Sequence, residues 1–190
     1  MAKTVAIVNQ KGGVGKTTTC VNLAAALQAL GKRVLVCDFD PQGNATSGLG
    51  VDKATLNPSI YEVLINGAPI QKAVVSTKWC DIIGSNKVLA GATVELISMP
   101  DRENLLKKAL AQLDEQYDYI FIDCPPSLEL LTLNALCAAQ FILIPVQCEY
   151  YALEGLSDLL TTMRIVKRSL NPGLSLMGVI LTMYDGRTNL

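Results

Sequence analysis

The stretch KGGVGKTTT at residues 11–19 directly follows a short apolar run, KTVAIVN at residues 3–9. The β-branched residues of that run predict a buried strand that ends where the glycines begin. Residues 17–30 are rich in alanine and leucine and stop at Gly31, which is typical of a helix with a glycine stop. RVLVCDFD at 33–40 predicts a second buried strand. The chain therefore opens as a β-loop-α-β unit, which implies a right-handed parallel crossover.

The same alternation continues along the chain. We expect further strands at 80–85, in the run ending at Asp123, at 141–147 and at 176–184, and helices at 60–65, 101–116, 128–138 and 151–169. The helix at 101–116 would have Asp101 as its N-cap. DPQGNATSGLG at 40–50 is too rich in Gly, Asn and Ser for regular structure and predicts a functional loop.

These elements predict one α/β domain over residues 1–190, built as a mostly parallel twisted sheet with helices on both faces. The chain stops at YDGRTNL, just after a strand, with no helix to cover that edge. We therefore expect that a C-terminal part is missing from this phosphate-loop type of fold.

The composition excludes several classes of function. The net charge is −1, so the chain has no overall basic field for nucleic acid. The chain has no histidine, and its six cysteines include no C-x-x-C pair, which argues against a zinc site. No apolar stretch reaches the roughly 18 residues of a transmembrane helix, and the N-terminus lacks the apolar core of a signal peptide. We expect a cytoplasmic protein with reduced, buried thiols and no stable membrane insertion.

The loop at 11–19 has the chemistry of a phosphate-binding loop. Glycines allow backbone N–H groups to surround an anion, and the helix N-terminus adds free donors and partial positive charge. Lys16 would reach the β- and γ-phosphates, and Thr17 would offer its hydroxyl to Mg²⁺. The standard pattern places a glycine at position 10, but the chain has Gln10 there and an additional lysine at Lys11.

Three aspartates at strand ends support this interpretation. Asp123 ends an apolar strand, where phosphate-loop enzymes place a Mg²⁺-associated aspartate. Asp38 and Asp40 end the second strand, and their spacing puts both on one face if the strand continues that far. One carboxylate could hold a metal-bound water while the other orients the attacking water. A single aspartate after a strand is more often part of a turn or a helix cap, so only the three aspartates together indicate a metal site.

Taken together, KGGVGKTTT, DFDPQGNATSGLG, FIDCPPS and PVQCEYYALEGL resemble the ParA/Soj family of chromosome- and plasmid-partitioning ATPases. That family belongs to the deviant Walker A group, with the MinD-type ATPases and the nitrogenase iron protein. The resemblance covers nearly all of the chain. It implies ATP and Mg²⁺ as cofactors and an ATP-dependent sandwich homodimer.

The resemblance also implies roles for individual residues. Lys11 would reach across the dimer to the partner's nucleotide, and Gly12 would lie where the two subunits touch. Asp40 would position the hydrolytic water, and Asp123 would be the Walker B aspartate. Asp38 would interact with the ligands of Mg²⁺ and not with the ion directly. The loop residues that would bind nucleotide are Lys11, Gly12, Gly13, Val14, Gly15, Lys16, Thr17 and Thr18.

Members of that family bind DNA without sequence preference and are stimulated by a ParB-like centromere-binding protein. By the resemblance, Arg187 is the best single candidate for DNA contact, and the protein would be nucleoid-associated. Arg164, Lys167 and Arg168 share one helix face, but they also complement the helix dipole. Three alternatives stay open: a MinD-like membrane-cycling ATPase, an iron–sulfur electron-transfer ATPase, and a nucleotide-gated DNA-binding module with incidental hydrolysis.

Overall fold

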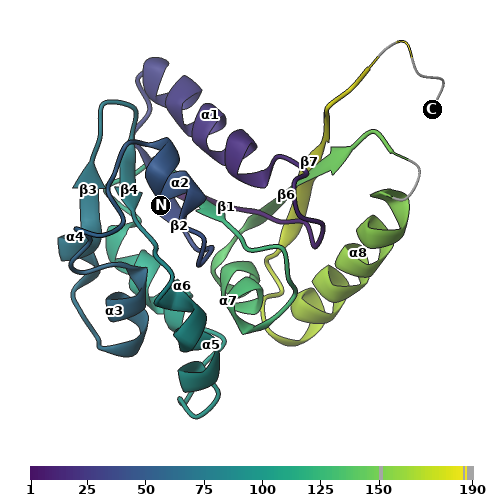
Figure 1. Ribbon diagram of the computed structural model, residues 1–190. Coiled ribbons are helices and arrows are strands. Elements are labelled where there is room, and N and C mark those ends of the chain that lie inside the picture. The colour runs from purple at the N-terminus through teal and green to yellow at the C-terminus, as the bar shows by residue number, and fades with distance from the viewer. Residues whose placement is uncertain (150–151, 186, 188–190) are drawn as a thin grey trace.

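A computed structural model describes residues 1–149, 152–185 and 187, without the side chains of 152–154. Within these residues, seven strands form one sheet in the order β3-β4-β2-β5-β1-β6-β7 (Figure 1). All neighbouring strands pair in parallel except β3 and β4, which are antiparallel at one edge. The strands are β1 (Lys3–Ile7), β2 (Val34–Asp38), β3 (Val74–Ser76), β4 (Asp81–Ile83), β5 (Tyr119–Asp123), β6 (Phe141–Gln147) and β7 (Ser175–Thr182).

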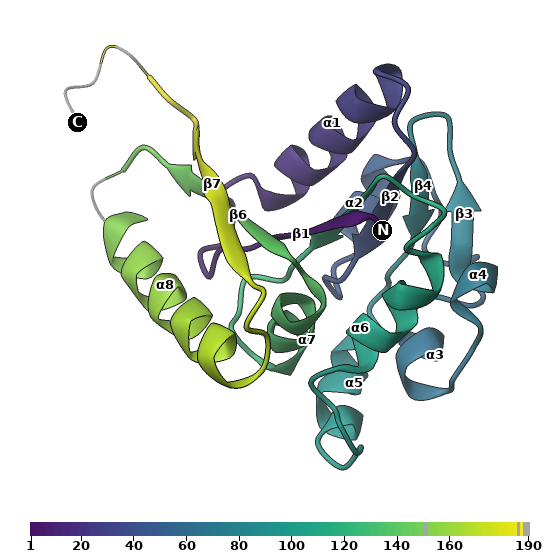
Figure 2. The ribbon, with the colours of Figure 1, turned by 180° about the vertical axis from the view of Figure 1, so that it is seen from behind.

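Helices cover both faces of this sheet, and Figure 2 shows the same arrangement from behind. The helices are α1 (Lys16–Ala29), α2 (Asn44–Gly48), α3 (Ile60–Ile65), α4 (Ile70–Ala73), α5 (Leu89–Leu96), α6 (Leu105–Leu110), the 3₁₀ helix η1 (Ala111–Leu113), α7 (Leu130–Ala138) and α8 (Ala152–Ser169). The expected mostly parallel α/β architecture is therefore confirmed.

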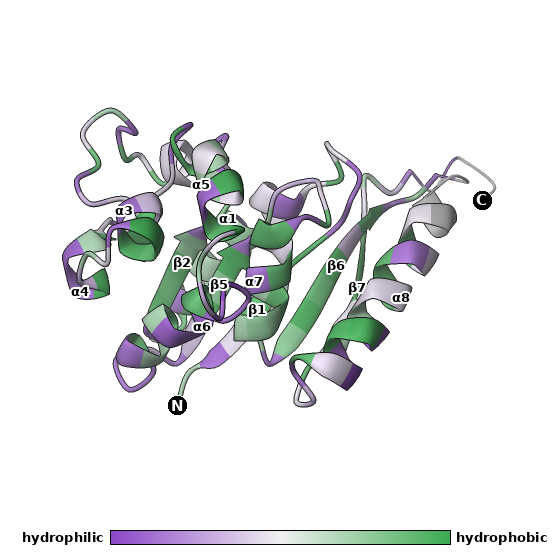
Figure 3. Ribbon diagram, turned by 90° about the horizontal axis from the view of Figure 1, so that it is seen from below, coloured by the Kyte–Doolittle hydropathy of each residue, from purple (hydrophilic) through white to green (hydrophobic). Residues whose placement is uncertain are grey.

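Two hydrophobic clusters fill the space above and below the sheet. One packs α1 and α2 against the sheet through residues such as Cys20, Ala24 and Ala45. The other packs α3 to α8 against the opposite face and includes Phe39, Leu106 and Leu136. The central strands β1, β2 and β5 are almost fully buried, which explains their continuous apolar runs. Figure 3 shows β2, β5 and β6 as hydrophobic bands between the helices.

The segments between residues 40 and 116 differ most from the sequence-based expectations. The loop at 40–50 contains a short helix, α2, which begins after Gly43 in the left-handed conformation. The long helix expected at 101–116 is wrong: Asp101 has a φ of 53°, which breaks helical geometry, and α6 begins only after Asn104. The helix at 60–65 is confirmed, with a capping box between Ser59 and Glu62.

The topology brings three strand ends to one place. β1 lies between β5 and β6, and β2 lies on the other side of β5, so the carboxyl ends of β1, β2 and β5 are neighbours. Asp123 aligns with Ile7 on one side and with Asp38 on the other. In open parallel sheets, ligands bind at this end of the strands. The loop at 11–18 that is expected to bind nucleotide follows β1, and Asp38 and Asp123 are the last residues of β2 and β5. Among the described residues, no helix has both the length and the apolar character needed to cross a membrane.

Candidate nucleotide site

The loop between β1 and α1 is shaped by two glycines with positive φ. Gly13 has a φ of 75° and Gly15 a φ of 89°, a region that residues with a side chain rarely adopt. Gly15 is also the N-cap of α1, and no side chain caps the first turn. The first N–H groups of α1 therefore stay available for an anion.

Gly12 is different from its two neighbours. It does not have a positive φ, and a Cβ atom added there would meet nothing within 4 Å. The single chain therefore tolerates a side chain at this position. If Gly12 is required, the reason lies outside the subunit.

Two contacts from distant segments hold the loop in place. Asn9 donates from Nδ2 to the Pro145 carbonyl at 2.7 Å, and its Oδ1 accepts from the Lys11 amide at 3.0 Å. Thr182, at the end of β7, donates from Oγ1 to the Val14 carbonyl at 2.9 Å. Sequence reasoning identified neither Asn9 nor Thr182, because their partners are far away along the chain.

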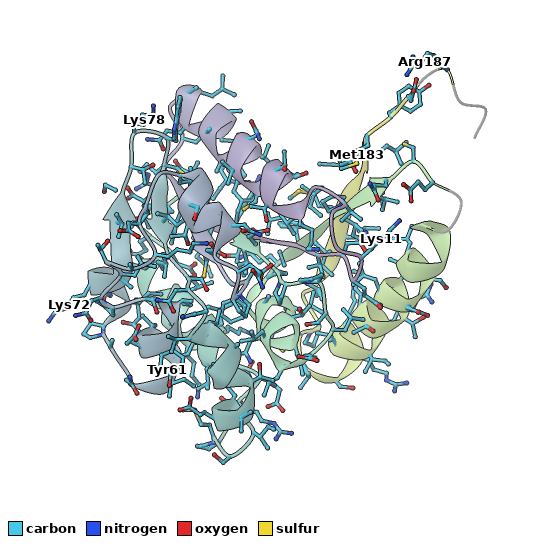
Figure 4. All side chains as sticks on the ribbon, viewed as in Figure 1. Lys11, Tyr61, Lys72, Lys78, Met183 and Arg187 are labelled. Carbon is cyan, nitrogen blue, oxygen red and sulfur yellow. The ribbon has the colours of Figure 1, made fainter. Side chains whose placement is uncertain are left out.

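The two lysines of the loop lie in contrasting environments. Lys16 is only 7% exposed, and its Nζ donates to the Lys11 carbonyl at 3.1 Å. Burial lowers the pKa of Lys16, and the negative charge of Asp123 partly opposes that shift. Lys11 is exposed, and its Nζ forms an ion pair with Glu149 Oε2 at 2.7 Å. Figure 4 shows Lys11 at the side of the molecule next to the start of α8.

Asp123 is the most unusual carboxylate of the site. It is completely buried, and among the described residues neither of its oxygens has a hydrogen-bond partner. Desolvation, followed by repulsion from Asp38, raises its pKa from the ordinary 3.8 to about 7. The Thr17 side chain lies near enough to lower that pKa, but its hydroxyl makes no hydrogen bond of good geometry with the carboxylate. A buried carboxylate without donors is a site prepared for a cation.

β2 ends at Asp38, so the strand does not continue to Asp40 and the condition for a shared strand face is not met, but the two residues still lie together just at and beyond its end. Asp38 is fully buried and Asp40 is 7% exposed, and the Asp40 amide donates to Asp38 Oδ1 at 3.3 Å. Burial is the main reason that the pKa of Asp38 rises to about 6. Thr46 of α2 opposes that rise by donating to Asp38 from both its amide and its hydroxyl. Thr46 lies in the stretch that we expected to be a functional loop, but its own role was not anticipated.

These residues suit a Mg²⁺ ion that is shared with a nucleotide. Thr17 and Asp123 supply oxygen atoms of the kind that Mg²⁺ prefers, and Asp123 has no protein donor to displace. No cluster of three or more acidic, cysteine or histidine side chains in the described parts of the chain could hold a metal alone. Mg²⁺ in phosphoryl-transfer sites keeps several waters and takes phosphate oxygens as ligands, so a small protein ligand set is sufficient.

Two further predicted site residues have exposed side chains. Thr18 is exposed on the first turn of α1. Arg187 lies beyond β7, away from the body of the molecule (Figure 4), and pairs with Asp185 at 2.6 Å. A pocket of about 410 Å³ lies at the opposite, amino-terminal end of the strands, beside Arg33, Asp81 and Tyr117. It contains none of the predicted site residues.

Comparison with known proteins identifies the family of the chain. A family model described as an AAA domain matches residues 2–176. The chain is 56% identical to the sporulation initiation inhibitor protein Soj of Bacillus subtilis, covering 100% of this chain and 76% of Soj. It is 52% identical to the chromosome partitioning protein ParA of Myxococcus xanthus, covering 100% of this chain and 68% of that protein.

Solved structures show the same fold. A crystal structure from Mycobacterium smegmatis, described as cobyrinic acid a,c-diamide synthase with bound ADP and magnesium, superimposes with a TM-score of 0.95 at 45% identity, over 99% of this chain and 77% of that one. A plasmid partition protein from Borrelia burgdorferi has a TM-score of 0.83 at 31% identity, over 97% of this chain and 80% of that one. The fold, the loop geometry and the identities agree that the chain belongs to the ParA/Soj family of partitioning ATPases.

Proposed function

We propose that the chain binds ATP and Mg²⁺ at residues 11–18, forms an ATP-dependent sandwich homodimer, and hydrolyses ATP slowly to drive the segregation of chromosomes or plasmids. In this proposal the dimer binds DNA non-specifically on the nucleoid, and a ParB-like centromere-binding protein stimulates turnover. The observation that carries the proposal is the convergence of Lys16, Asp40 and Asp123 at the ends of three adjacent strands.

The chemistry of phosphoryl transfer explains what each group would do. The transition state spreads negative charge over the phosphate oxygens, so fixed positive charge lowers the barrier. Lys16 and the N–H groups of the first turn of α1 would hold the phosphates. Thr17 and Asp123 would hold Mg²⁺, which neutralises charge on the β- and γ-phosphates. Asp40 would orient the attacking water, with Asp38 supporting the metal site from behind.

The environment of Lys11 supports a role across a dimer. Its ion pair with Glu149 is on the surface, where the two side chains are 44% and 54% exposed. Ion pairs of this kind contribute at most about 1 kcal/mol, so Lys11 can exchange Glu149 for a partner's phosphate at little cost. The open space beside Gly12 supports close contact between subunits at the same place.

The decisive experiment compares Lys16→Ala with the wild type in a binding assay with a fluorescent ATP analogue and Mg²⁺. Lys72→Ala is the matched control, because Lys72 is exposed on α4 far from the site (Figure 4). We expect Lys16→Ala to abolish binding and Lys72→Ala to bind normally. Unchanged affinity in Lys16→Ala would refute the nucleotide site.

Turnover is then measured with and without DNA and a ParB-like protein. Stimulation by both supports the partitioning cycle. Turnover that neither component changes would reject the DNA and partner parts of the proposal while leaving the ATPase assignment intact.

A further inference from the structure

Thr46 is a fully buried residue on the short helix α2, and it faces the end of β2. Two of its atoms donate to the same carboxylate oxygen, Asp38 Oδ2: the amide at 2.7 Å and the hydroxyl at 2.6 Å. Hydrogen bonds to a buried carboxylate are strong because the acceptor is charged and no water competes. Thr46 therefore fixes the orientation of Asp38.

The direction of the Thr46 hydroxyl follows from a third contact. The Ser85 amide, just beyond β4, donates to Thr46 Oγ1 at 2.9 Å. An N–H group can only donate, so Oγ1 accepts from Ser85 and directs its single hydrogen to Asp38. The hydroxyl is thus held from both sides and joins the ends of β2 and β4 to helix α2.

This arrangement reaches the residue proposed to orient water. With Oδ2 of Asp38 occupied by Thr46, the other oxygen, Oδ1, accepts from the Asp40 amide at 3.3 Å. The Asp40 carboxylate in turn accepts from the Gln42 amide at 2.9 Å. The hydrogen bonds form a continuous series from Ser85 through Thr46 and Asp38 to Asp40.

We propose that Thr46 is a positioning residue for ATP hydrolysis, which holds Asp38 and, through it, the backbone of Asp40. The inference rests on the hydrolytic role proposed for Asp40. Without the Thr46 hydroxyl, Asp38 loses a donor while its negative charge still faces Asp123 across the strand pair. The Thr46 amide still donates to Oδ2, but with one of its two donors gone Asp38 is held less firmly, and so is the Asp40 amide that donates to Oδ1.

The test compares Thr46→Val with Thr46→Ser in the full chain. Valine keeps the shape and removes the hydroxyl, whereas serine keeps the hydroxyl and removes a methyl group. We expect Thr46→Val to lower kcat by about tenfold or more, with KM for ATP changed by less than about twofold. Thr46→Ser should stay within about threefold of the wild-type kcat, because it retains the donor.

A purely structural role predicts a different pattern. In that case Thr46→Ser and Thr46→Val would lower the melting temperature, but kcat measured well below melting would stay at the wild-type value for both. That result would overturn the inference. If Thr46→Val does not fold, Thr46→Ala removes the same hydroxyl without placing an additional methyl against the carboxylate, and the same two outcomes apply.

A double-mutant cycle separates this inference from the proposal on which it rests. Unchanged turnover in Asp40→Ala would show that the role of Asp40 is wrong. If Asp40→Ala loses turnover, adding Thr46→Val to it should cause little further loss, since Thr46 acts through Asp40. A further loss equal to that of Thr46→Val alone would show that Thr46 acts independently, and the inference would fail.

Discussion

Replacing Asp123 with asparagine should make the metal-free protein more stable and inactive at the same time. In the absence of Mg²⁺, the Asp123 carboxylate is buried, has no hydrogen-bond donor among the described residues, and lies opposite Asp38. These conditions raise its pKa from 3.8 to about 7. The folded state therefore binds a proton at this site more tightly than the unfolded state does.

The sign of the effect on stability follows from proton linkage. Between pH 4 and pH 7 the folded protein holds the proton that the unfolded chain releases, so the free energy of unfolding falls as pH rises through this range. Above pH 7 Asp123 is ionised in the folded state, and its burial then lowers the free energy of unfolding by at most about 4 kcal/mol. The asparagine amide leaves its own polar atoms without partners at a cost of about 1–3 kcal/mol. The net gain for Asp123→Asn at pH 8 is about 1–3 kcal/mol.

Thermal unfolding in EDTA measures this gain directly. For a chain of this size, about 1–3 kcal/mol raises the melting temperature by roughly 3–10 °C. The advantage should shrink at pH 5, where the wild-type carboxylate is already protonated. The variant should also lose turnover and most of the stabilisation that Mg²⁺ and ATP give the wild type.

Asp118→Asn is the matched control for this experiment. Asp118 immediately precedes β5, at the opposite end of the strand from Asp123, and its hydrogen bonds from Arg33 hold its pKa down at about 2. Its neutralisation should bring no gain at pH 8. A melting temperature of Asp123→Asn below that of the wild type at pH 8 in EDTA would refute the reasoning, because it would show that the ionised carboxylate is stabilised by groups other than a metal.

Three further predictions concern the loop and the end of the chain. Gly12→Val should bind nucleotide within about twofold of the wild type but fail to dimerise with ATP by light scattering, because the subunit itself has room for the side chain; normal dimers would contradict this. Gly13→Val, the control, should instead lose about 1–2 kcal/mol of stability, since its φ is 75°. Lys11→Ala should keep its nucleotide affinity and lose about tenfold or more in turnover of the dimer, and wild-type turnover would rule out a role across the interface. Arg187→Glu should weaken DNA binding and reduce its salt dependence while ATP binding stays normal, and unchanged DNA affinity would remove Arg187 as a contact.

The sequence predicted the core of the fold because the relevant signals are local. Apolar runs identify β1, β2 and β5, and the glycines of residues 11–15 identify the loop that follows β1. Adjacent parallel strands then bring Asp38 and Asp123 together without further information. The functions assigned to Lys11, Gly12 and Arg187 stay predictions, because they depend on a second subunit or on DNA.

Other parts could not be predicted because they depend on contacts between distant segments. Asp101 looked like an N-cap, but its backbone turns into the left-handed region and delays the helix until Leu105. In the sequence, nothing distinguishes Thr46 from the other polar residues of its loop. Its role becomes visible only in the structure, where α2 places its hydroxyl against Asp38. The ion pair of Lys11 with Glu149 joins residues 138 positions apart, and no local pattern indicates it.

The hydrogen bond from Thr182 to the Val14 carbonyl has a consequence for how the protein is made. The two residues are separated by 168 positions, so the phosphate loop is translated long before the strand that completes it. Val14 is 1% exposed, and without Thr182 its carbonyl would lose this partner. During synthesis, the phosphate loop of the nascent chain therefore lacks its hydrogen bond from Thr182 until β7 has been made. A loop that is translated early is therefore among the last parts of this domain to reach its final geometry, because that geometry requires β7 to join the sheet.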